Sequence, residues 1–406
     1  MVFVVYVAPN YTENAVKFLE KLAVIPDIRL GLISQEPLSF LKTELQKCIL
    51  EFEQIADVFS YDLLLGAAKK LIEKQGSIFR LFGAVEQVQV PAALVREQLG
   101  ISGMSSETMK NFRDKSRMKN LFRAAGIPCA SHCLATDRTE VLEFAEKTGF
   151  PLVIKPNDGA ASQSTYMVNE LSDLETVLGK WEVSASKPML AEEFILGTEH
   201  SFDTFSLDGK HLFHSITNYY PNPLKVISEP WIQWQVVLPR EVEAPEYDDI
   251  RTAAYRALDV LGMETGITHM EWFRRQDGSI AISEVAARPP GAQFTTLISR
   301  ATDMDCINAW ARLMIFGEFE VPQRKYATGA AYLRGQGTGK VSHVTGLDII
   351  GNELGHLVTD AKIPEKGQEK GLTYEGEGYI IVRHEDTRVV KLALEKIVST
   401  VRVHLG

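Results

Sequence analysis

Two glutamates flank a predicted hairpin in the second half of the chain. Asp277-Gly278 is a strong signal for a two-residue turn, because both central positions require φ > 0, and strand-forming residues lie on either side. With that loop, Glu271 lies directly opposite Glu284, and opposed carboxylates repel each other unless a cation lies between them. Mg²⁺ prefers oxygen ligands and commonly carries bound phosphates. The hairpin therefore predicts a metal site for a phosphate-bearing ligand; the alternative is a solvated hairpin with two unrelated glutamates.

Two basic residues are placed to act beside this hairpin. Arg288 follows Glu284 by four residues, at the exit of the second strand, where its guanidinium can donate to a carboxylate or a phosphate. Lys115 lies in a basic helical stretch, 107–125, and we keep it as a candidate. Most of the other cations in that stretch are expected on a solvated helix face.

A third basic residue precedes a loop of small residues. Lys155 lies near the end of an apolar strand, 152–156, and the loop 157–165 follows it before another strand. Backbone N–H groups of such a loop can wrap an anion, and small side chains permit close approach. Ser162 and Ser164 are the candidate residues in it, although a loop of this kind is more often only a turn.

Acidic residues in an apolar strand suggest a second part of the pocket. Glu192 and Glu193 lie within the apolar segment 189–195, and Glu199 follows shortly after it. This pattern favours an edge strand beside a pocket, whose backbone could bind a planar ring such as adenine while Glu199 accepts bonds from ribose hydroxyls. Surface acids on an edge strand are the equally weighted alternative. An aromatic segment, 213–234, is expected to approach the pocket of the acceptor substrate.

Length and composition limit the class of protein. The chain has 406 residues, enough for two or three domains, with 45% hydrophobic and 24% charged residues, which is ordinary for a globular protein. The net charge of −10 argues against nucleic-acid and anionic-membrane partners. No apolar run is long enough for a transmembrane helix, and the N-terminal segment reads as a buried strand rather than a signal peptide. Four cysteines are too few for a disulfide framework, which fits a reducing, cytoplasmic location.

The elements that must position these residues fall into three predicted domains. Residues 1–105 alternate strands and helices, including a helix over 38–52 and a short strand near Val58, which predicts a parallel sheet with helices on both faces. Its first turn, Ala8-Pro9-Asn10, lacks the dinucleotide-binding glycines, so it is Rossmann-like in shape only. Residues 106–326 form the central domain, with a lid subdomain at about 131–190. Residues 327–406 form a small α+β domain.

Two further motifs are given weak functional weight. Residues 334–340 resemble a phosphate-binding P-loop, but Arg334 replaces the required glycine, so this stretch is expected to be a turn. His269 shares a strand face with Glu271 and could join the site, although a packed or solvent-facing histidine is the more frequent case.

Taken in order, these residues resemble the ATP-grasp superfamily, in particular carboxylate–amine ligases of the L-amino-acid ligase and biotin-carboxylase-like type. The resemblance rests on six motifs across nearly the whole chain: Arg-Asp-Lys115, Val-Ile-Lys155-Pro with its loop, Glu192-Glu193-Phe-Ile, Gly-Thr-Glu199, Met-Glu271 and Ser-Glu284-Val-Ala-Ala-Arg288. It implies a multidomain α/β and α+β fold: a Rossmann-like pre-ATP-grasp domain, a two-lobed ATP-grasp domain with a mobile lid, and the small last domain.

The resemblance also implies roles for individual residues. Lys115 and Lys155 would hold the ATP phosphates, with the loop that contains Ser162 and Ser164. Glu192 and Glu193, with the backbone of Phe194 and Ile195, would form the adenine hinge, and Glu199 would bind the ribose. Glu271 and Glu284 would bind Mg²⁺, two ions in all, with Mn²⁺ as an alternative, and Arg288 would hold the substrate carboxylate or the reaction's oxyanions. Many members carry asparagine two residues after the second glutamate, where this chain has Ala286, which affects the second metal site.

The implied activity is an ATP-dependent carboxylate–amine ligase that forms an amide, such as a dipeptide, through an acylphosphate. Its substrates would be small molecules and its assembly a homodimer. A bicarbonate- or formate-activating ligase of the biotin-carboxylase or purine-biosynthesis type is the alternative. A non-catalytic nucleotide-binding protein on the same fold is the third and weakest hypothesis.

Overall fold

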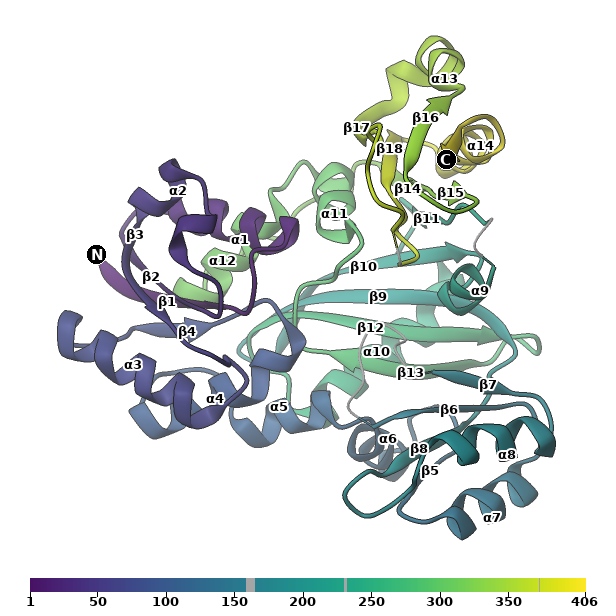
Figure 1. Ribbon diagram of the computed structural model, residues 1–406, viewed down its shortest axis with the longest axis horizontal. Helices are drawn as coiled ribbons and strands as arrows, with labels where there is room; N and C mark the ends of the chain where they lie inside the picture. Colours follow the sequence, from purple (N-terminus) through teal and green to yellow (C-terminus); the bar gives the residue numbers. More distant parts are fainter. Residues whose placement is uncertain (158–164, 230–231, 372) are drawn as a thin grey trace.

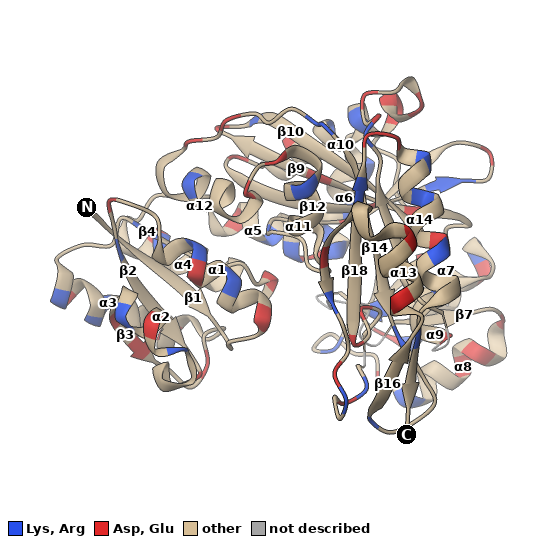
Figure 2. Cartoon of the chain, turned by 90° about the horizontal axis from the view of Figure 1, so that it is seen from above, with Lys and Arg blue, Asp and Glu red and all other residues tan. Residues whose placement is uncertain are grey.

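The computed structural model describes residues 1–157, 165–229, 232–371 and 373–406, and within these ranges four sheets carry helices on their faces (Figure 1). The predicted phosphate-loop residues Ser162 and Ser164 lie outside the described residues. No helix in the described ranges is both long and apolar enough to cross a bilayer. Figure 2 shows basic and acidic residues interspersed along the outer helices.

The first part of the chain is a parallel four-stranded sheet in the order β3-β2-β1-β4. Apolar residues on both faces of β1 and β2 are buried, because helices cover the sheet from both sides, as predicted. One face is covered by α1 together with the distant helix α12, and the other face by α3 and α4. The bounds are β1 Val2–Ala8, α1 Glu13–Ala23, β2 Ile28–Ser34, β3 Ile49–Gln54, α3 Tyr61–Gln75, β4 Arg80–Phe82, α4 Gln89–Leu99 and α12 Cys306–Phe316.

The predicted helix over 38–52 is confirmed only in its middle, and the predicted strand near Val58 is wrong. A 3₁₀ turn, Leu38–Phe40, and a short helix α2, Thr43–Cys48, are followed directly by β3. Leu, Glu, Gln and Lys in this stretch favour a helix locally, but backbone pairing with β2 outweighs that preference. Val58 is a buried core residue in the loop after the strand.

The lid sheet lies over the central sheet and has the order β5-β8-β6-β7. It is reached through two consecutive helices, α5 Ser106–Arg113 and α6 Lys115–Ala124, which meet at Asp114; its carboxylate caps α6 by accepting from the Arg117 N–H at 2.8 Å. The lid elements are β5 His132–Ala135, α7 Arg138–Thr148, β6 Leu152–Pro156, β7 Tyr166–Val168, α8 Leu171–Lys180 and β8 Met189–Glu193. Because β8 lies between β5 and β6, the predicted edge strand at 189–195 is wrong.

An eight-stranded sheet, in the order β13-β12-β9-β10-β11-β14-β18-β17, forms the centre of the molecule. Its elements are β9 Gly197–Leu207, β10 Lys210–Tyr220, α9 Pro223–Ser228, β11 Gln235–Leu238, α10 Asp248–Leu261, β12 Gly266–Arg275, β13 Ile280–Ala286 and α11 Phe294–Thr302. The strands alternate between two cores, one shared with α10 and the other with α11 and α12. This sheet therefore supplies the rigid floor on which Glu199, Glu271 and Glu284 are mounted.

The last part of the chain continues this sheet. β14 Ala327–Leu333, β17 Val358–Lys362 and β18 Gly378–His384 extend it, and β15 Gly335–Gln336, β16 Val341–Thr345 and β19 Arg402–Leu405 form a small separate sheet. Helices α13 Leu347–Leu354 and α14 Thr387–Thr400 pack against them. The P-loop-like stretch 334–340 is followed directly by strand β16 and not by the helix that a P-loop requires. The domain limits given above stay a prediction.

Candidate active site

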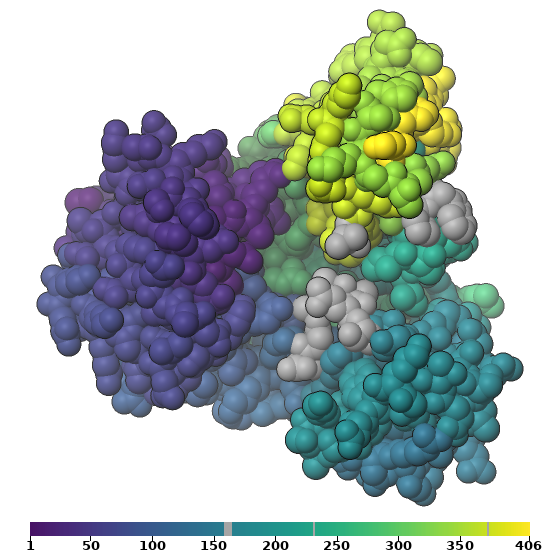
Figure 3. Space-filling model, in the orientation of Figure 1, coloured from purple at the N-terminus to yellow at the C-terminus, as the bar shows by residue number. Residues whose placement is uncertain are grey.

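A cavity of about 470 Å³ lies where the first domain, the lid, the central sheet and the last segment meet. Figure 3 shows these bodies around its mouth. Ten of the predicted residues line it: Lys115, Lys155, Glu192, Glu193, Phe194, Ile195, Glu199, Glu271, Glu284 and Arg288. The structure thus gathers in one cavity residues that are up to 173 positions apart in the sequence, 288 − 115.

The two hairpin glutamates lie directly opposite each other, as predicted, but the loop and the strand pairing that place them there differ from the prediction. The Arg275 N–H donates to the Ser279 carbonyl at 2.8 Å, so the loop has three residues, 276–278, and only Gly278 has positive φ. A bulge in β13 after Ile282 then inserts one extra residue and restores the pairing of Glu271 with Glu284. The predicted two-residue turn is wrong because a three-residue loop needs the left-handed conformation only at its last position.

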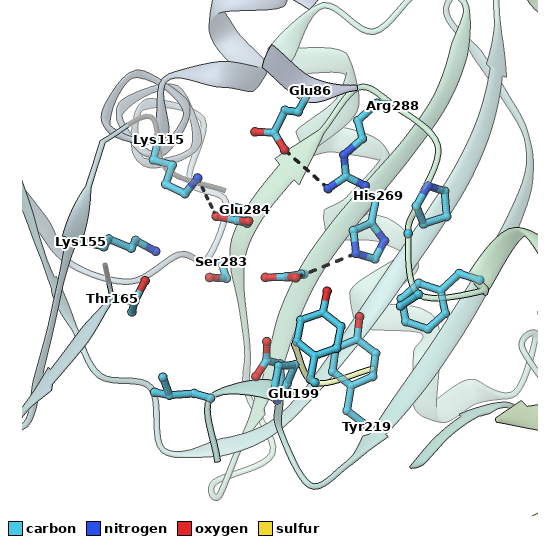
Figure 4. Close-up of a pocket in the computed structure, with 18 of the residues that line it drawn as sticks. Glu86, Lys115, Lys155, Thr165, Glu199, Tyr219, His269, Ser283, Glu284 and Arg288 are labelled. Atoms are coloured by element: carbon cyan, nitrogen blue, oxygen red, sulfur yellow. Dashed lines mark ion pairs between the residues drawn. The ribbon is translucent and has the colours of Figure 1, made fainter. Parts of the chain in front are cut away.

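Lys115 and Glu284 form an ion pair inside the cavity. Lys115 Nζ lies 3.0 Å from Glu284 Oε2, and Figure 4 shows the lysine pointing at the strand that carries the glutamate. Burial alone would raise the pKa of Glu284, but the ammonium groups of Lys115 and Lys155 outweigh it and lower that pKa to about 2. Glu284 is therefore ionised at neutral pH.

The neighbouring acids have the opposite shift. Burial, reinforced by the Glu284 charge, raises the pKa of Glu271, and burial with the charges of Glu271 and Glu284 raises the pKa of Glu199 well above its ordinary value. Three carboxylates thus crowd one end of the cavity, and repulsion among them is what a bound cation would relieve.

Lys155 is held by Glu192 from the neighbouring strand of the lid sheet. Its Nζ lies 2.8 Å from Glu192 Oε2, and both side chains line the cavity. Burial lowers the affinity of Lys155 for its proton, but Glu192 and Glu284 outweigh it, so the pKa of Lys155 is raised. This lysine is therefore charged where it faces the cavity, close to Thr165 at the end of the predicted phosphate loop (Figure 4).

A comparison with protein-family models decides what this arrangement is. Residues 120–303 match the model for the ATP-grasp domain. This part of the chain is an ATP-grasp domain. The matched residues include the lid sheet and the hairpin that carries Glu271 and Glu284. Lys115 lies five residues before the start of the match.

Several named ligases and synthetases are similar to this chain. An L-arginine-specific L-amino acid ligase from Bacillus subtilis is 26% identical over 235 residues, which is 56% of this chain and 56% of that relative's length. The solved structure of an L-amino acid ligase from Bacillus licheniformis superposes with a TM-score of 0.80 at 16% identity, covering 100% of this chain and 99% of the other. The N5-carboxyaminoimidazole ribonucleotide synthetase from Thermotoga maritima superposes with a TM-score of 0.72 at 16% identity, covering 100% of both chains.

Sequence reasoning missed one buried cation beside the matched domain. Lys119, expected with its neighbours on a solvated helix face, is 0% exposed. Its Nζ donates to the Ser283 carbonyl at 2.6 Å and lies 3.3 Å from Glu192 Oε1. The available signal was its spacing, because a residue four positions after Lys115 lies on the same face of a helix.

The hinge segment differs in part from the prediction. The Phe194 N–H already donates to the Pro151 carbonyl at 3.2 Å, so only its side chain and carbonyl face other groups. Glu193 is paired with Arg275 at 2.7 Å and accepts from the Ser131 N–H at 3.1 Å. Glu192 Oε1 lies buried without a hydrogen bond among the described residues, although it is near Lys119.

Arg288 enters the ATP-grasp cavity from the end of β13 and meets the first domain there. Glu86, from the short turn before α4, lies 3.5 Å from the Arg288 guanidinium and 3.1 Å from that of Arg113. His269 is buried, and its Nδ1 lies 2.6 Å from the Asp203 carboxylate, while its Nε2 lies 3.9 Å from Glu271 (Figure 4). The packed histidine is therefore also a cavity residue.

Proposed function

We propose that this protein is an ATP-dependent ligase that joins a small carboxylate to a small amine through an acylphosphate, releasing ADP and phosphate. The observation that carries the proposal is the convergence of Lys115, Lys155 and Arg288 on the opposed pair Glu271 and Glu284 in one cavity. The relatives whose names specify L-amino acid ligases support amino acids as substrates.

The donor set fits a magnesium ion bound with ATP. Glu271 and Glu284 present carboxylate oxygens on one face of the sheet, and the raised pKa of Glu271 reflects a repulsion that a cation would offset. When bound there, Mg²⁺ would neutralise charge on the phosphate oxygens. Ala286, which pairs with His269, supplies no side-chain oxygen, so we propose that water completes the coordination of the second ion.

The nucleotide fits the lid side of the cavity. Lys155, fixed by Glu192, and Lys115, fixed by Glu284, supply two positive charges for the phosphates. Glu192 Oε1 lies 3.3 Å from Lys119 Nζ and accepts no other hydrogen bond among the described residues, so it keeps a lone pair suited to the adenine amino group. Glu199 and Ile195 also line the cavity, and we assign them to the ribose and the adenine ring, respectively. Ser162 and Ser164 belong to this proposal as phosphate-loop residues.

Catalysis in this site comes from positioning and charge neutralisation. Arg288 would orient a carboxylate oxygen toward the γ-phosphorus of ATP, and that oxygen forms a bond to phosphorus while the bond to the leaving ADP breaks. The amine then attacks the acyl carbon, phosphate leaves, and the nitrogen loses a proton. The acylphosphate is unstable in water, so closure of the lid over the cavity protects it.

The remaining wall of the cavity is aromatic and would face the substrate side chains. Tyr219, Trp234, Phe294 and Tyr374 pack edge-to-face or stacked on one another, with Trp234 and Tyr374 ring centroids 4.7 Å apart. Trp231, in the predicted aromatic segment, lies outside the described residues. A rigid aromatic wall suits an apolar substrate side chain.

The decisive experiment measures phosphate release from ATP and Mg²⁺ with a panel of amino acids, singly and in pairs, and with bicarbonate and formate as controls. Release that requires a carboxylate and an amine together is the expected result. Release with bicarbonate or formate in place of an amino acid would replace this proposal with the bicarbonate- or formate-activating alternative. No phosphate release with any member of the panel would favour a protein that only binds nucleotide.

The setting of the enzyme is part of the same proposal. The net charge of −10 supports small-molecule substrates rather than nucleic acid or an anionic membrane. We expect a homodimer in the cytoplasm, which size-exclusion chromatography with light scattering and cell fractionation can check.

A further inference from the structure

One buried ammonium group lies between the two sheets of the site. Lys119 is on α6, one turn after Lys115, and its Nζ contacts the Ser283 carbonyl at 2.6 Å and Glu192 Oε1 at 3.3 Å. Ser283 belongs to β13 of the central sheet, whereas Glu192 belongs to β8 of the lid sheet. The side chain therefore links two bodies that belong to different lobes.

Both partners of Lys119 adjoin residues to which we assign ligand contacts. The other carboxylate oxygen of Glu192 holds Lys155 Nζ at 2.8 Å. Ser283 is the bulged residue that precedes Glu284 and resets its register against Glu271. Through these two contacts, Lys119 sits at the junction between the phosphate-facing lysine and the strand that carries the acidic pair.

The helix does not need Lys119 in order to dock. Met118 and Phe122 of α6 are buried in the core that α6 shares with α10 and β13. The segment that follows the helix is joined to β13 by the Ile282 N–H, which donates to the Pro128 carbonyl at 2.9 Å. A buried charge costs stability unless it is paired, and an apolar side chain could fill the same space. Attachment of the helix therefore does not explain the polar contacts of Lys119.

A third contact ties the same helix to the start of the phosphate loop. The Ser116 N–H donates to Asn157 Oδ1 at 2.9 Å, and the Lys115 N–H to the Asn157 carbonyl at 3.4 Å. The first turns of α6 thus contact the end of β6, β8 and β13 within five residues, 115 to 119. This is the arrangement expected of an element that sets the two lobes relative to each other.

We infer that Lys119 is a positioning residue for nucleotide binding, which fixes Glu192, and through it Lys155, relative to the strand that carries Glu284. In this arrangement the lysine that faces the phosphates and the acidic pair form one rigid frame before the nucleotide arrives. Groups one contact away from a ligand commonly orient those that touch it. The inference rests on the proposed function for the identity of the nucleotide.

Calorimetric titration of ADP with Mg²⁺ tests the inference on the whole chain. We expect K119M to raise the Kd for ADP about 10-fold to 100-fold, and K119R to recover part of the loss. The KM for ATP should rise in the same ratio, while the KM values for the carboxylate and the amine stay unchanged. A purely structural lysine would lower the melting temperature without this split between substrates.

The matched control is R123M, one turn further along α6. Arg123 is exposed and contacts His132 at 2.9 Å, outside the cavity, so its loss should leave ADP binding unchanged. If K119M does not fold, K119Q gives the same test, because its amide can donate to the Ser283 carbonyl but carries no charge for Glu192.

The outcomes separate the two proposals. Wild-type protein that binds no ADP would overturn the proposed function, and with it the inference. Wild-type protein that binds ADP, with K119M or K119Q binding it equally tightly, would overturn the inference alone. Weaker binding in R123M as well would also overturn it, since any basic residue of the helix would then have the same effect.

Discussion

Glu284 and Glu271 lie directly opposite each other, yet their surroundings differ. Glu284 is paired with Lys115 at 3.0 Å, whereas the cation nearest to Glu271 in an ion-pair contact is the His269 ring at 3.9 Å, when that ring is protonated. Accordingly the pKa of Glu284 is lowered and the pKa of Glu271 is raised. Glu284 is thus a fixed anion, whereas Glu271 ionises more readily when a cation binds. Metal binding should therefore release a proton from Glu271 at a pH near its raised pKa.

Removal of Glu284 should abolish turnover and leave the protein folded. We expect E284A to lower kcat by at least about 100-fold, because one of the two proposed carboxylate ligands of Mg²⁺ is lost. The same variant should lose the rise in melting temperature that Mg²⁺ and ADP together give the wild type. The measurements are steady-state phosphate release and thermal unfolding. The matched control is E395A, on an exposed position of α14; near-normal turnover in E284A would contradict the metal assignment.

The two ends of the cavity should respond to different substitutions. K155M is expected to raise the KM for ATP, because Lys155 faces the phosphates, whereas R288M should raise the KM for the carboxylate substrate and leave that for ATP nearly unchanged. The expected loss in kcat/KM is about 100-fold for each variant. Initial-rate kinetics with one substrate varied at a time check this. An equal rise for ATP and carboxylate in both variants would show that the two residues do not serve separate substrates.

The sequence predicted the alternating first domain and the opposed glutamates, because both depend on local patterns. Strand and helix periodicity sufficed for α1, α3, β1 and β2, and Glu271 was placed opposite Glu284. That placement succeeded although the turn was wrong, since the longer loop and the bulge shift the register by one residue each in opposite directions. The opposition of Glu271 and Glu284 therefore does not depend on the type of turn.

What the sequence could not supply are contacts between distant segments. Lys119 was assigned to solvent because a charged helix usually is solvated, and nothing local indicates that β8 and β13 close over it. Residues 49–52 are predicted as helix from local pattern alone, because the strand partner, β2, lies elsewhere in the chain. Glu86 and Tyr374 reach the cavity from opposite ends of the sequence, and no motif marks either residue.

Acid should destabilise the protein in part through His214. Its ring is buried, stacked on Phe202, and its Nε2 lacks a hydrogen bond in the described structure. Burial lowers the pKa of His214 from 6.5 to about 4, although Glu243 opposes the shift. Between these pH values the unfolded chain binds a proton that the folded chain does not. The contribution of His214 to the free energy of unfolding is therefore fully present above pH 6.5 and is lost as the pH falls toward 4.

The change from pH 7 to pH 5 should cost about 2 kcal/mol through this residue. H214N keeps a polar group for Tyr255, whose hydroxyl lies 3.0 Å from the ring, but does not titrate. Urea unfolding measures the free energy of unfolding at the two pH values. The gap between them should be smaller by about 2 kcal/mol in H214N than in the wild type. H356N, at an exposed histidine, should leave the gap unchanged. An undiminished gap in H214N would show that His214 is protonated in the folded protein at pH 5.

Glu86 and Arg288 should act as a coupled pair in binding the carboxylate substrate. Glu86 comes from the first domain, and it contacts both Arg288 at 3.5 Å and Arg113 at 3.1 Å, which together fix the guanidinium at the cavity wall. We expect E86Q to raise the KM for the carboxylate several-fold while the KM for ATP stays the same. In the double variant E86Q/R288M the effect of E86Q should disappear, because the group that it orients is gone. Additive effects in this double-mutant cycle would show that Glu86 acts on the substrate independently of Arg288.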